Sequence, residues 1–314
     1  MNPDNPSPAG AKAHPNFLIA GAAKSGTTSL YAWLKQHKDV FLPDLKEPTY
    51  FVDHYSPLDW DGYLSLFQAG ADCRMRGEAS ASYLAAPEAA QRIYNALGPI
   101  KIILLLRDPV QRARSLHRWM VMAGYEWIGD FEQALAEEDK RITDDHFRKH
   151  NPEYFWSYMY FHSGLYHEQV DRFFRVFGRD RVRVFLFEEL VHQSAWVYEE
   201  ACRHLEIAPG PGPRYEAHNP SRSPRWSGLQ FALRSTRDRS VSGSGPWARP
   251  VRIASQHLMA MNLAVGRDRP ETDATNRRLR QAYRDDVRRL SNLINLDLSG
   301  WTRKGHEDAS ALAA

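Results

Sequence analysis

The sequence predicts an α/β fold with a central, mostly parallel sheet flanked by helices. Two observations carry this prediction. Short apolar stretches typical of buried strands alternate along the chain with helical patterns, as they do in parallel sheets. One stretch, KIILLL over residues 101–106, is apolar without interruption after its first residue, which is typical of a central strand covered on both faces.

The first hundred residues predict two further strands and two helices. Residues 17–20 form a short buried strand, and a glycine-containing loop follows over 21–28. Residues 29–37 place apolar side chains on one helical face, and residues 40–42 form a second short strand. Proline is favoured at the first position of a helix, so Pro87 predicts a helix that runs to about Leu97.

The rest of the chain continues the same alternation. A helix starts near Pro109, and aromatic residues at helical spacing predict another helix from Tyr166 to Phe177, which Gly178 ends. Residues 182–187 form a strand. Residues 276–296 form a long amphipathic helix whose inward side chains are Leu279, Tyr283, Val287, Leu290 and Ile294.

The length of 314 residues is compatible with one domain. We expect a disordered N-terminal arm over 1–15, a single domain over 16–302 and a disordered tail over 303–314. Serine, glycine and proline between helical patterns predict a flexible loop over 239–250.

Composition excludes several classes of protein. Hydrophobic residues make up 43% of the chain, which rules out disorder throughout, and a net charge of +3 is too balanced to indicate nucleic-acid binding. No apolar stretch approaches the roughly 20 residues of a membrane span, and the first 15 residues lack a signal-peptide core, so we predict a cytoplasmic protein. Charge is uneven locally: eight arginines and one acid, Asp238, lie between Ala217 and Arg267. That segment is either a solvated surface or a loop facing an anionic ligand.

Cysteine and histidine give no sign of a metal centre. Cys73 and Cys202 are too few for a disulfide framework or a cysteine-based zinc site, and each is expected to be a small buried hydrophobe. The 13 histidines are scattered, and we expect no H-x-x-x-H pair on an evident helix. The prediction is therefore a protein without a metal.

The most informative motif follows the first strand. In FLIAGAAKSGTTSL, a strand leads into a loop that opens a helix, and backbone N–H groups at such a start form an anion site. Gly21 and Gly26 have the separation of a Walker A motif, but Thr27 occupies the position of its lysine. The lysine lies inside the loop instead, as Lys24. There it can contact a single bridging oxygen of a bound ligand rather than two phosphates.

This motif resembles the 5′-phosphosulfate loop of sulfotransferases, which use 3′-phosphoadenosine 5′-phosphosulfate (PAPS). The resemblance implies a P-loop-type three-layer fold. It also implies that Lys24 contacts the bridging oxygen and that the donor's 5′-phosphate is bound by the loop residues Lys24, Ser25, Gly26, Thr27, Thr28 and Ser29.

The resemblance also implies a second anchor, for the donor's 3′-phosphate. It requires an arginine that ends a central strand and a serine eight residues later, and Arg107 and Ser115 have that spacing. Arginine makes forked contacts to phosphate, and serine adds a hydroxyl. Asp108 after the apolar strand also resembles a Walker B carboxylate, which leaves open a P-loop kinase that uses ATP and Mg²⁺.

Two further segments resemble the sulfotransferases related to the heparan sulfate N- and 3-O-enzymes and their bacterial counterparts. In KEPTYF, the resemblance makes Glu47 the general base and Lys46 a substrate or donor contact. In RGEASASYL, Glu78 lines the pocket, acts as a second carboxylate, or has a structural capping or ion-pair role. Ala79 stands where the sugar enzymes carry a lysine. The resemblance runs from about residue 16 to Trp301.

The late disulfide-closed donor loop of the sugar enzymes has no counterpart in the cysteine pattern, and Arg222 and Arg225 are candidates for the missing cationic contacts. The resemblance predicts transfer of a sulfuryl group to a hydroxyl or amine of a small-molecule, lipid or carbohydrate acceptor. The alternatives are the kinase and a non-catalytic nucleotide-binding module. Six aromatic residues either line an acceptor pocket or belong to the core: Trp119, Tyr125, Trp127, Trp156, Tyr158 and Tyr160.

Overall fold

The computed structural model describes residues 13–52, 56–215, 222–242, 248–265 and 273–303. Its internal contacts divide the chain into two compact units. The first contains residues 1–106 and 171–217, and the second contains 107–170 and 218–314. The single domain expected over 16–302 therefore stays a prediction. Residues 1–12 of the expected arm and 304–314 of the expected tail lie outside the described residues.

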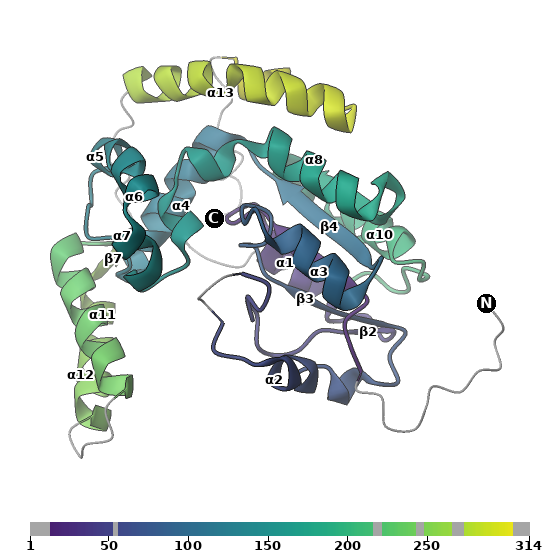
Figure 1. Cartoon of the computed structure of the whole chain (residues 1–314), viewed down its shortest axis with the longest axis horizontal. Helices are drawn as coiled ribbons and strands as arrows, with labels where there is room; N and C mark the ends of the chain where they lie inside the picture. Colours follow the sequence, from purple (N-terminus) through teal and green to yellow (C-terminus); the bar gives the residue numbers. More distant parts are fainter. Residues whose placement is uncertain (1–12, 53–55, 216–221, 243–247, 266–272, 304–314) are drawn as a thin grey trace. The chain divides into compact units, whose positions relative to one another are not determined.

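A five-stranded sheet forms the centre of the first unit (Figure 1). Its strands are β1 (Phe17–Gly21), β2 (Val40–Phe41), β3 (Met75–Ala79), β4 (Lys101–Leu106) and β5 (Val182–Leu186). They lie in the order β2-β3-β1-β4-β5, and every pair is parallel. Helices α1 (Thr27–Leu34) and α10 (Ser194–His204) pack against it. The predicted α/β fold with a parallel sheet is confirmed.

Strand β3 is the one strand of this sheet that the sequence pattern did not reveal. Its sequence, MRGEA, carries a glycine and two charged residues, yet it lies between β1 and β2 and is mostly buried. Gly77 fits because the ring of Phe17 on β1 lies where a side chain would be: a Cβ atom at Gly77 would come within 2.4 Å of that ring. Glu78 pairs in register with Leu18 at the centre of the sheet.

Several predicted boundaries were wrong by a few residues, for local reasons. Helix α1 begins at Thr27 rather than Ser29, because the Gly26 carbonyl already accepts the N–H groups of Ser29 and Leu30. Strand β5 ends at Leu186, because the Glu189 carboxylate accepts the Leu186 N–H at 2.8 Å and starts helix α9 (Phe187–His192).

The remaining helices of the first unit are α2 (Trp60–Ser65) and α3 (Ala89–Leu97), the latter starting two residues after Pro87. Helix α8 (Tyr166–Phe177) matches its prediction, and Gly178 follows it with a positive φ of 81°. Cys202 is buried, Cys73 is half-buried, and both are free thiols.

The second unit is mainly helical. Helix α4 (Pro109–Ala123) starts at Asp108, whose carboxylate accepts the N–H groups of Val110 and Gln111 at 2.8 and 3.2 Å. The other elements are α5 (Phe131–Ala136), α6 (Glu138–Thr143), α7 (Asp145–His150), α11 (Ser227–Ser242), α12 (Ala248–Asn262), α13 (Asp273–Ile294) and the two-stranded sheet of β6 (Arg222–Pro224) and β7 (Leu263–Val265).

The flexible loop predicted over 239–250 was wrong at both ends. Helix α11 continues to Ser242 and helix α12 begins at Ala248, while residues 243–247 lie outside the described residues. The two helices pack against each other, so tertiary contacts outweigh the local serine and glycine content. Helix α13 ends at Ile294 rather than residue 296, because Asn295 takes a left-handed conformation with φ 55°.

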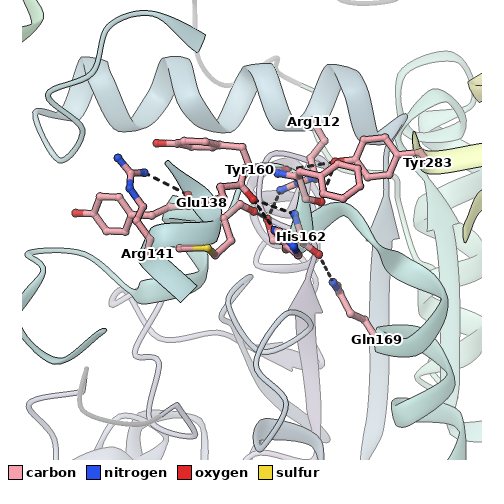
Figure 2. Close-up of polar contacts among 11 residues, drawn as sticks. Arg112, Glu138, Arg141, Tyr160, His162, Gln169 and Tyr283 are labelled. Carbon is pink, nitrogen blue, oxygen red and sulfur yellow. Dashed lines mark hydrogen bonds and ion pairs between the residues drawn. The ribbon is translucent and has the colours of Figure 1, made fainter. Parts of the chain in front are cut away.

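A buried polar network ties helices of the second unit together (Figure 2). The Arg112 guanidinium donates to the carbonyl of Tyr160 at 2.5 Å and to the Ser163 hydroxyl at 3.0 Å. Glu138 accepts the N–H of Phe161 at 2.7 Å and contacts Nδ1 of His162 at 2.8 Å, which raises the pKa of His162. These contacts hold residues 160–163, which precede α8, in place. They also give the buried charges of Arg112 and Glu138 the partners that such charges require.

Candidate active site

The loop between β1 and α1 has the geometry of an anion-binding turn. Lys24 has a positive φ of 66°, which is uncommon for a residue with a side chain, and Gly26 follows with φ 89°. A Cβ atom at Gly26 would lie 2.7 Å from Leu190 Cδ2, so both the conformation and the space require glycine. The loop is thereby held against helix α9.

Ser25 is the loop residue that gives the strongest evidence for a bound ligand. It is fully buried, and among the described residues its hydroxyl has no hydrogen-bond partner. A buried polar group without a partner costs free energy, and such groups occur where a ligand supplies the missing bond. The N–H groups of Gly26, Thr27 and Thr28 precede the first bonds of helix α1, as at every helix start. These groups suit a phosphate.

Glu47 is fastened to the end of strand β3. Its backbone N–H donates to the Ala79 carbonyl at 3.0 Å, and its carboxylate accepts the Ala81 N–H at 2.7 Å through Oε2. The other oxygen, Oε1, pairs with the Lys46 ammonium. Glu47 also has a positive φ of 62°, so its loop is held in a rarely populated conformation. Its side chain is 38% exposed, which leaves it accessible to a substrate.

Glu78 lies fully buried beside this loop. Its Oε2 accepts the Ser80 hydroxyl at 2.8 Å, and the same Ser80 oxygen accepts the Thr49 N–H at 3.1 Å. Burial raises the pKa of Glu78 to about 7, and the nearby negative charge of Glu47 adds to the rise. These contacts are those of the structural role among the three left open for Glu78, since it anchors the 47–49 loop through Ser80.

Lys24 and Glu47 are brought to one edge of the sheet. Lys24 lies three residues after the end of β1, and Glu47 is bonded to Ala79, the last residue of β3. Because β1 and β3 are parallel neighbours, both residues follow the carboxyl ends of adjacent strands, where open α/β sheets bind ligands.

Arg107 and Ser115 lie in the second unit. Arg107 follows the last residue of β4 in the chain and is 8% exposed, and its Nη2 atom donates to Gln111 Oε1 at 3.3 Å. Gln111 and Ser115 are four residues apart on helix α4, so they share one face. The arginine and the serine therefore line the same side of the start of α4. Gln111 was missed by the sequence pattern, although its i, i+4 relation to Ser115 was a usable signal.

Asp108 does not have the setting of a Walker B carboxylate. Its Oδ1 atom caps helix α4, and its Oδ2 atom pairs with Arg280 Nη1 at 2.8 Å. With the side chain 1% exposed, both oxygens are occupied by structural partners. This arrangement weakens the kinase alternative.

Two of the six candidate aromatic residues are core. Tyr160 is fully buried and its hydroxyl donates to Glu126 at 2.9 Å, and Tyr158 is buried with its hydroxyl on the Tyr125 carbonyl. Trp127 is the opposite case, since 61% of it is exposed.

The expectation of no H-x-x-x-H pair on a helix was wrong. His146 and His150 have this spacing on helix α7, and their rings stack with centroids 4.3 Å apart. Among the described residues no third histidine, cysteine or carboxylate completes a metal-binding group with them. The pair was overlooked because α7 is short and its pattern is not apolar.

The five-stranded parallel sheet and the loop that joins β1 to α1 place the chain among the α/β proteins. The chain belongs to the sulfotransferase domain family, whose model matches residues 14–219. A sulfotransferase from Alicyclobacillus acidocaldarius has a similar crystal structure, with 30% sequence identity and a TM-score of 0.70, and the match covers 93% of this chain and all of that one.

Two curated relatives match a shorter region. The membrane-associated sulfotransferase kil1 of Dictyostelium discoideum is 34% identical over 116 residues, and human heparan sulfate glucosamine 3-O-sulfotransferase 3B1 is 36% identical over 121 residues. Each match covers 36% of this chain, and the chain spans 24% and 30% of the length of these relatives. The resemblance to heparan sulfate sulfotransferases, predicted from the motifs, is confirmed.

Proposed function

We propose that the protein transfers a sulfuryl group from PAPS to a hydroxyl or amine of an acceptor. The observation that carries this proposal is the placement of Lys24 and Glu47 at the carboxyl ends of the neighbouring strands β1 and β3, both in left-handed backbone conformations. An acid–base group and a cation are thus held rigidly at one edge of the sheet, as group transfer requires.

In the proposed reaction, the acceptor oxygen or nitrogen forms a bond to sulfur, and the bond between sulfur and the bridging oxygen breaks. The acceptor proton passes to the Glu47 carboxylate, which is accessible and held by the Ala81 N–H. Lys24 neutralises the charge that develops on the bridging oxygen as adenosine 3′,5′-bisphosphate leaves. Lys46, paired with Glu47, orients that carboxylate or contacts a substrate oxygen.

We assign the donor's phosphates to two groups of residues. The 5′-phosphate is bound by the loop from Lys24 to Ser29, and the partnerless buried hydroxyl of Ser25 supports this assignment. The 3′-phosphate is bound by Arg107 and Ser115, with Gln111 holding the arginine side chain in place. A sulfuryl group carries less charge than a γ-phosphoryl group, so we expect transfer without a metal.

The acceptor is a small molecule, a lipid or a carbohydrate. One relative is named for heparan sulfate, but this chain has Ala79 where the sugar enzymes carry a lysine. An acidic polysaccharide would lose a cationic contact at that position.

The test combines donor binding with transfer. Calorimetry should find adenosine 3′,5′-bisphosphate binding far more tightly than AMP, and incubation with labelled PAPS and acceptors of the three classes should give a product heavier by one sulfuryl group. Equal affinities for the two nucleotides, or turnover of ATP instead of PAPS, would refute the proposal.

A further inference from the structure

Helices α11 and α12 form a hairpin that the proposed transfer chemistry does not use. They lie side by side in the second unit (Figure 1), and Asn262 near the end of α12 donates to Gln230 of α11 at 2.9 Å. One stripe of α12 faces this contact and is buried or half-buried; it consists of Val251, Ser255, Met259 and Asn262.

The outward surface of α12 is divided into an apolar arc and a basic edge. At about 100° per residue, the apolar arc spans roughly 140° of the helix. Its apolar members are Ile253, Ala254, Leu258 and Met261, and the imidazole of His257 lies within it; all five are exposed. The basic edge lies beside it and consists of Arg249, Arg252 and Gln256, which are exposed as well. A helix with one packed stripe, one exposed apolar arc and one cationic edge has an unpartnered amphipathic face.

Two tryptophans enlarge the apolar part of this surface. Met261 is 72% exposed, and Trp226, directly before α11, is 66% exposed. Trp127 is 61% exposed and lies two residues before Gly129, where a Cβ atom would come 2.8 Å from the hydroxyl of Ser227, the residue after Trp226. Tryptophan is enriched where one side of a residue meets hydrocarbon and the other meets water.

The charge of the hairpin is strongly positive. Asp238 is the single acid between residues 217 and 267, and it is already paired with Arg234 and Arg237. Arg225 and Arg252 are exposed, and no ion pair is seen for either among the described residues. The surface therefore presents uncompensated cations next to exposed apolar side chains.

We propose that this hairpin docks the protein on an anionic lipid surface, with the apolar arc of α12 and the two tryptophans at the acyl–headgroup boundary and the arginines on lipid phosphates. Amphipathic helices of this composition lie in the plane of a membrane interface. A second copy of the chain fits less well, because it would set arginine against arginine. A polyanion such as nucleic acid or an acidic polysaccharide would leave the apolar side chains of Leu258 and Met261 exposed to water. No helix among the described residues is long and apolar enough to span a bilayer.

The experiment measures co-sedimentation of the full-length protein with vesicles, without nucleotide, so that its outcome is independent of sulfuryl transfer. We expect binding to phosphatidylcholine vesicles that contain one third phosphatidylglycerol to be at least ten-fold tighter than to pure phosphatidylcholine, and to weaken with salt. Leu258→Glu with Met261→Glu should reduce binding at least ten-fold. Arg249→Glu with Arg252→Glu should do the same and remove the salt dependence.

Leu45→Glu is the matched control, because Leu45 is 47% exposed but lies in the first unit. It should bind like the unmodified protein, and circular dichroism and the thermal midpoint should be unchanged in all variants. Equal binding to neutral and anionic vesicles, or full binding by the hairpin variants, would overturn the proposal. So would a dimer that Leu258→Glu dissociates, or hairpin-dependent binding of DNA or heparin without binding to vesicles.

Discussion

Glu47 is the residue on which the proposed chemistry depends most. Glu47→Gln keeps the shape of the side chain and removes its basicity, so kcat should fall by roughly 10²–10⁴ while bisphosphate affinity changes little. Lys24→Ala should lower both turnover and donor affinity, since in the proposed mechanism Lys24 contacts the bound donor as well as the leaving group. Steady-state kinetics at saturating acceptor and calorimetry with the bisphosphate separate the two effects.

The control for this pair is Glu206→Gln, because Glu206 is an exposed carboxylate that pairs with Lys101 away from the loop. It should leave kcat unchanged. Near-normal turnover by Glu47→Gln would show that Glu47 is not the base.

Glu78 should make stability depend on pH. Its pKa rises from 4.5 to about 7 on folding, mainly through burial, so the folded state holds the proton more tightly than the unfolded state. The resulting destabilisation is absent below the unfolded pKa, grows between pH 4.5 and 7, and is constant above. A rise of this size corresponds to roughly 3 kcal/mol at 25 °C.

Glu78→Gln removes the ionisable group and with it this pH dependence. Between pH 4 and pH 8, the unfolding free energy of the variant should therefore rise by about that amount relative to that of the unmodified protein. Urea unfolding at several pH values measures the change. Parallel stability curves would mean that Glu78 titrates normally in the folded protein.

The phosphate loop is an element whose geometry depends on Gly26. Gly26→Ala would force an alanine into φ 89° with Leu190 Cδ2 2.7 Å away, so we expect a loss of about 1–3 kcal/mol in unfolding free energy and weaker bisphosphate binding. Gly210→Ala is the control, because Gly210 also has a positive φ but its nearest neighbour, His37, is at an ordinary 3.7 Å. If both variants lose the same stability and neither loses affinity, the close packing of the loop on α9 has no part in binding.

The start of helix α4 is the element that we propose for the donor's 3′-phosphate. Arg107→Ala should weaken the binding of adenosine 3′,5′-bisphosphate by roughly 1.5–3 kcal/mol, the range for a hydrogen bond to a charged group. The binding of AMP should be nearly unaffected. Gln111→Ala should have a smaller effect in the same direction, because it frees the arginine side chain. Titration calorimetry with both nucleotides checks this, and an equal loss for AMP would remove the 3′-phosphate assignment.

For the whole molecule, we expect transfer to continue in excess EDTA. The sulfuryl group needs less charge neutralisation than a phosphoryl group, Thr27 replaces the Walker lysine, and Asp108 is occupied by the α4 cap and Arg280. Activity should stay near its untreated level. A collapse that Mg²⁺ reverses would favour the kinase alternative.

Local sequence patterns were sufficient to predict the elements whose own residues show an apolar run or an apolar periodicity. The run at 101–106, the helix ended by Gly178 and the loop around Lys24 all read correctly, because apolar periodicity and glycine placement act over a few residues. Apart from Gln111, the residues proposed for the site came from the sequence motifs and their resemblance to sulfotransferases.

Tertiary structure alone decided the rest, because it depends on what lies opposite each residue. Strand β3 is a strand because Gly77 admits the Phe17 ring, although its own sequence does not favour one. Glu47 is hydrogen-bonded to Ala79 and Ala81, which lie more than 30 residues later in the chain. The burial that raises the pKa of Glu78 likewise depends on residues distant in sequence. Helices α11 and α12 extend into both ends of the loop expected over 239–250 because they pack on each other. The sequence by itself determined the fold class and the sulfotransferase motifs, whereas the positions of the candidate site residues and the raised pKa of Glu78 follow from non-local contacts that no local pattern records.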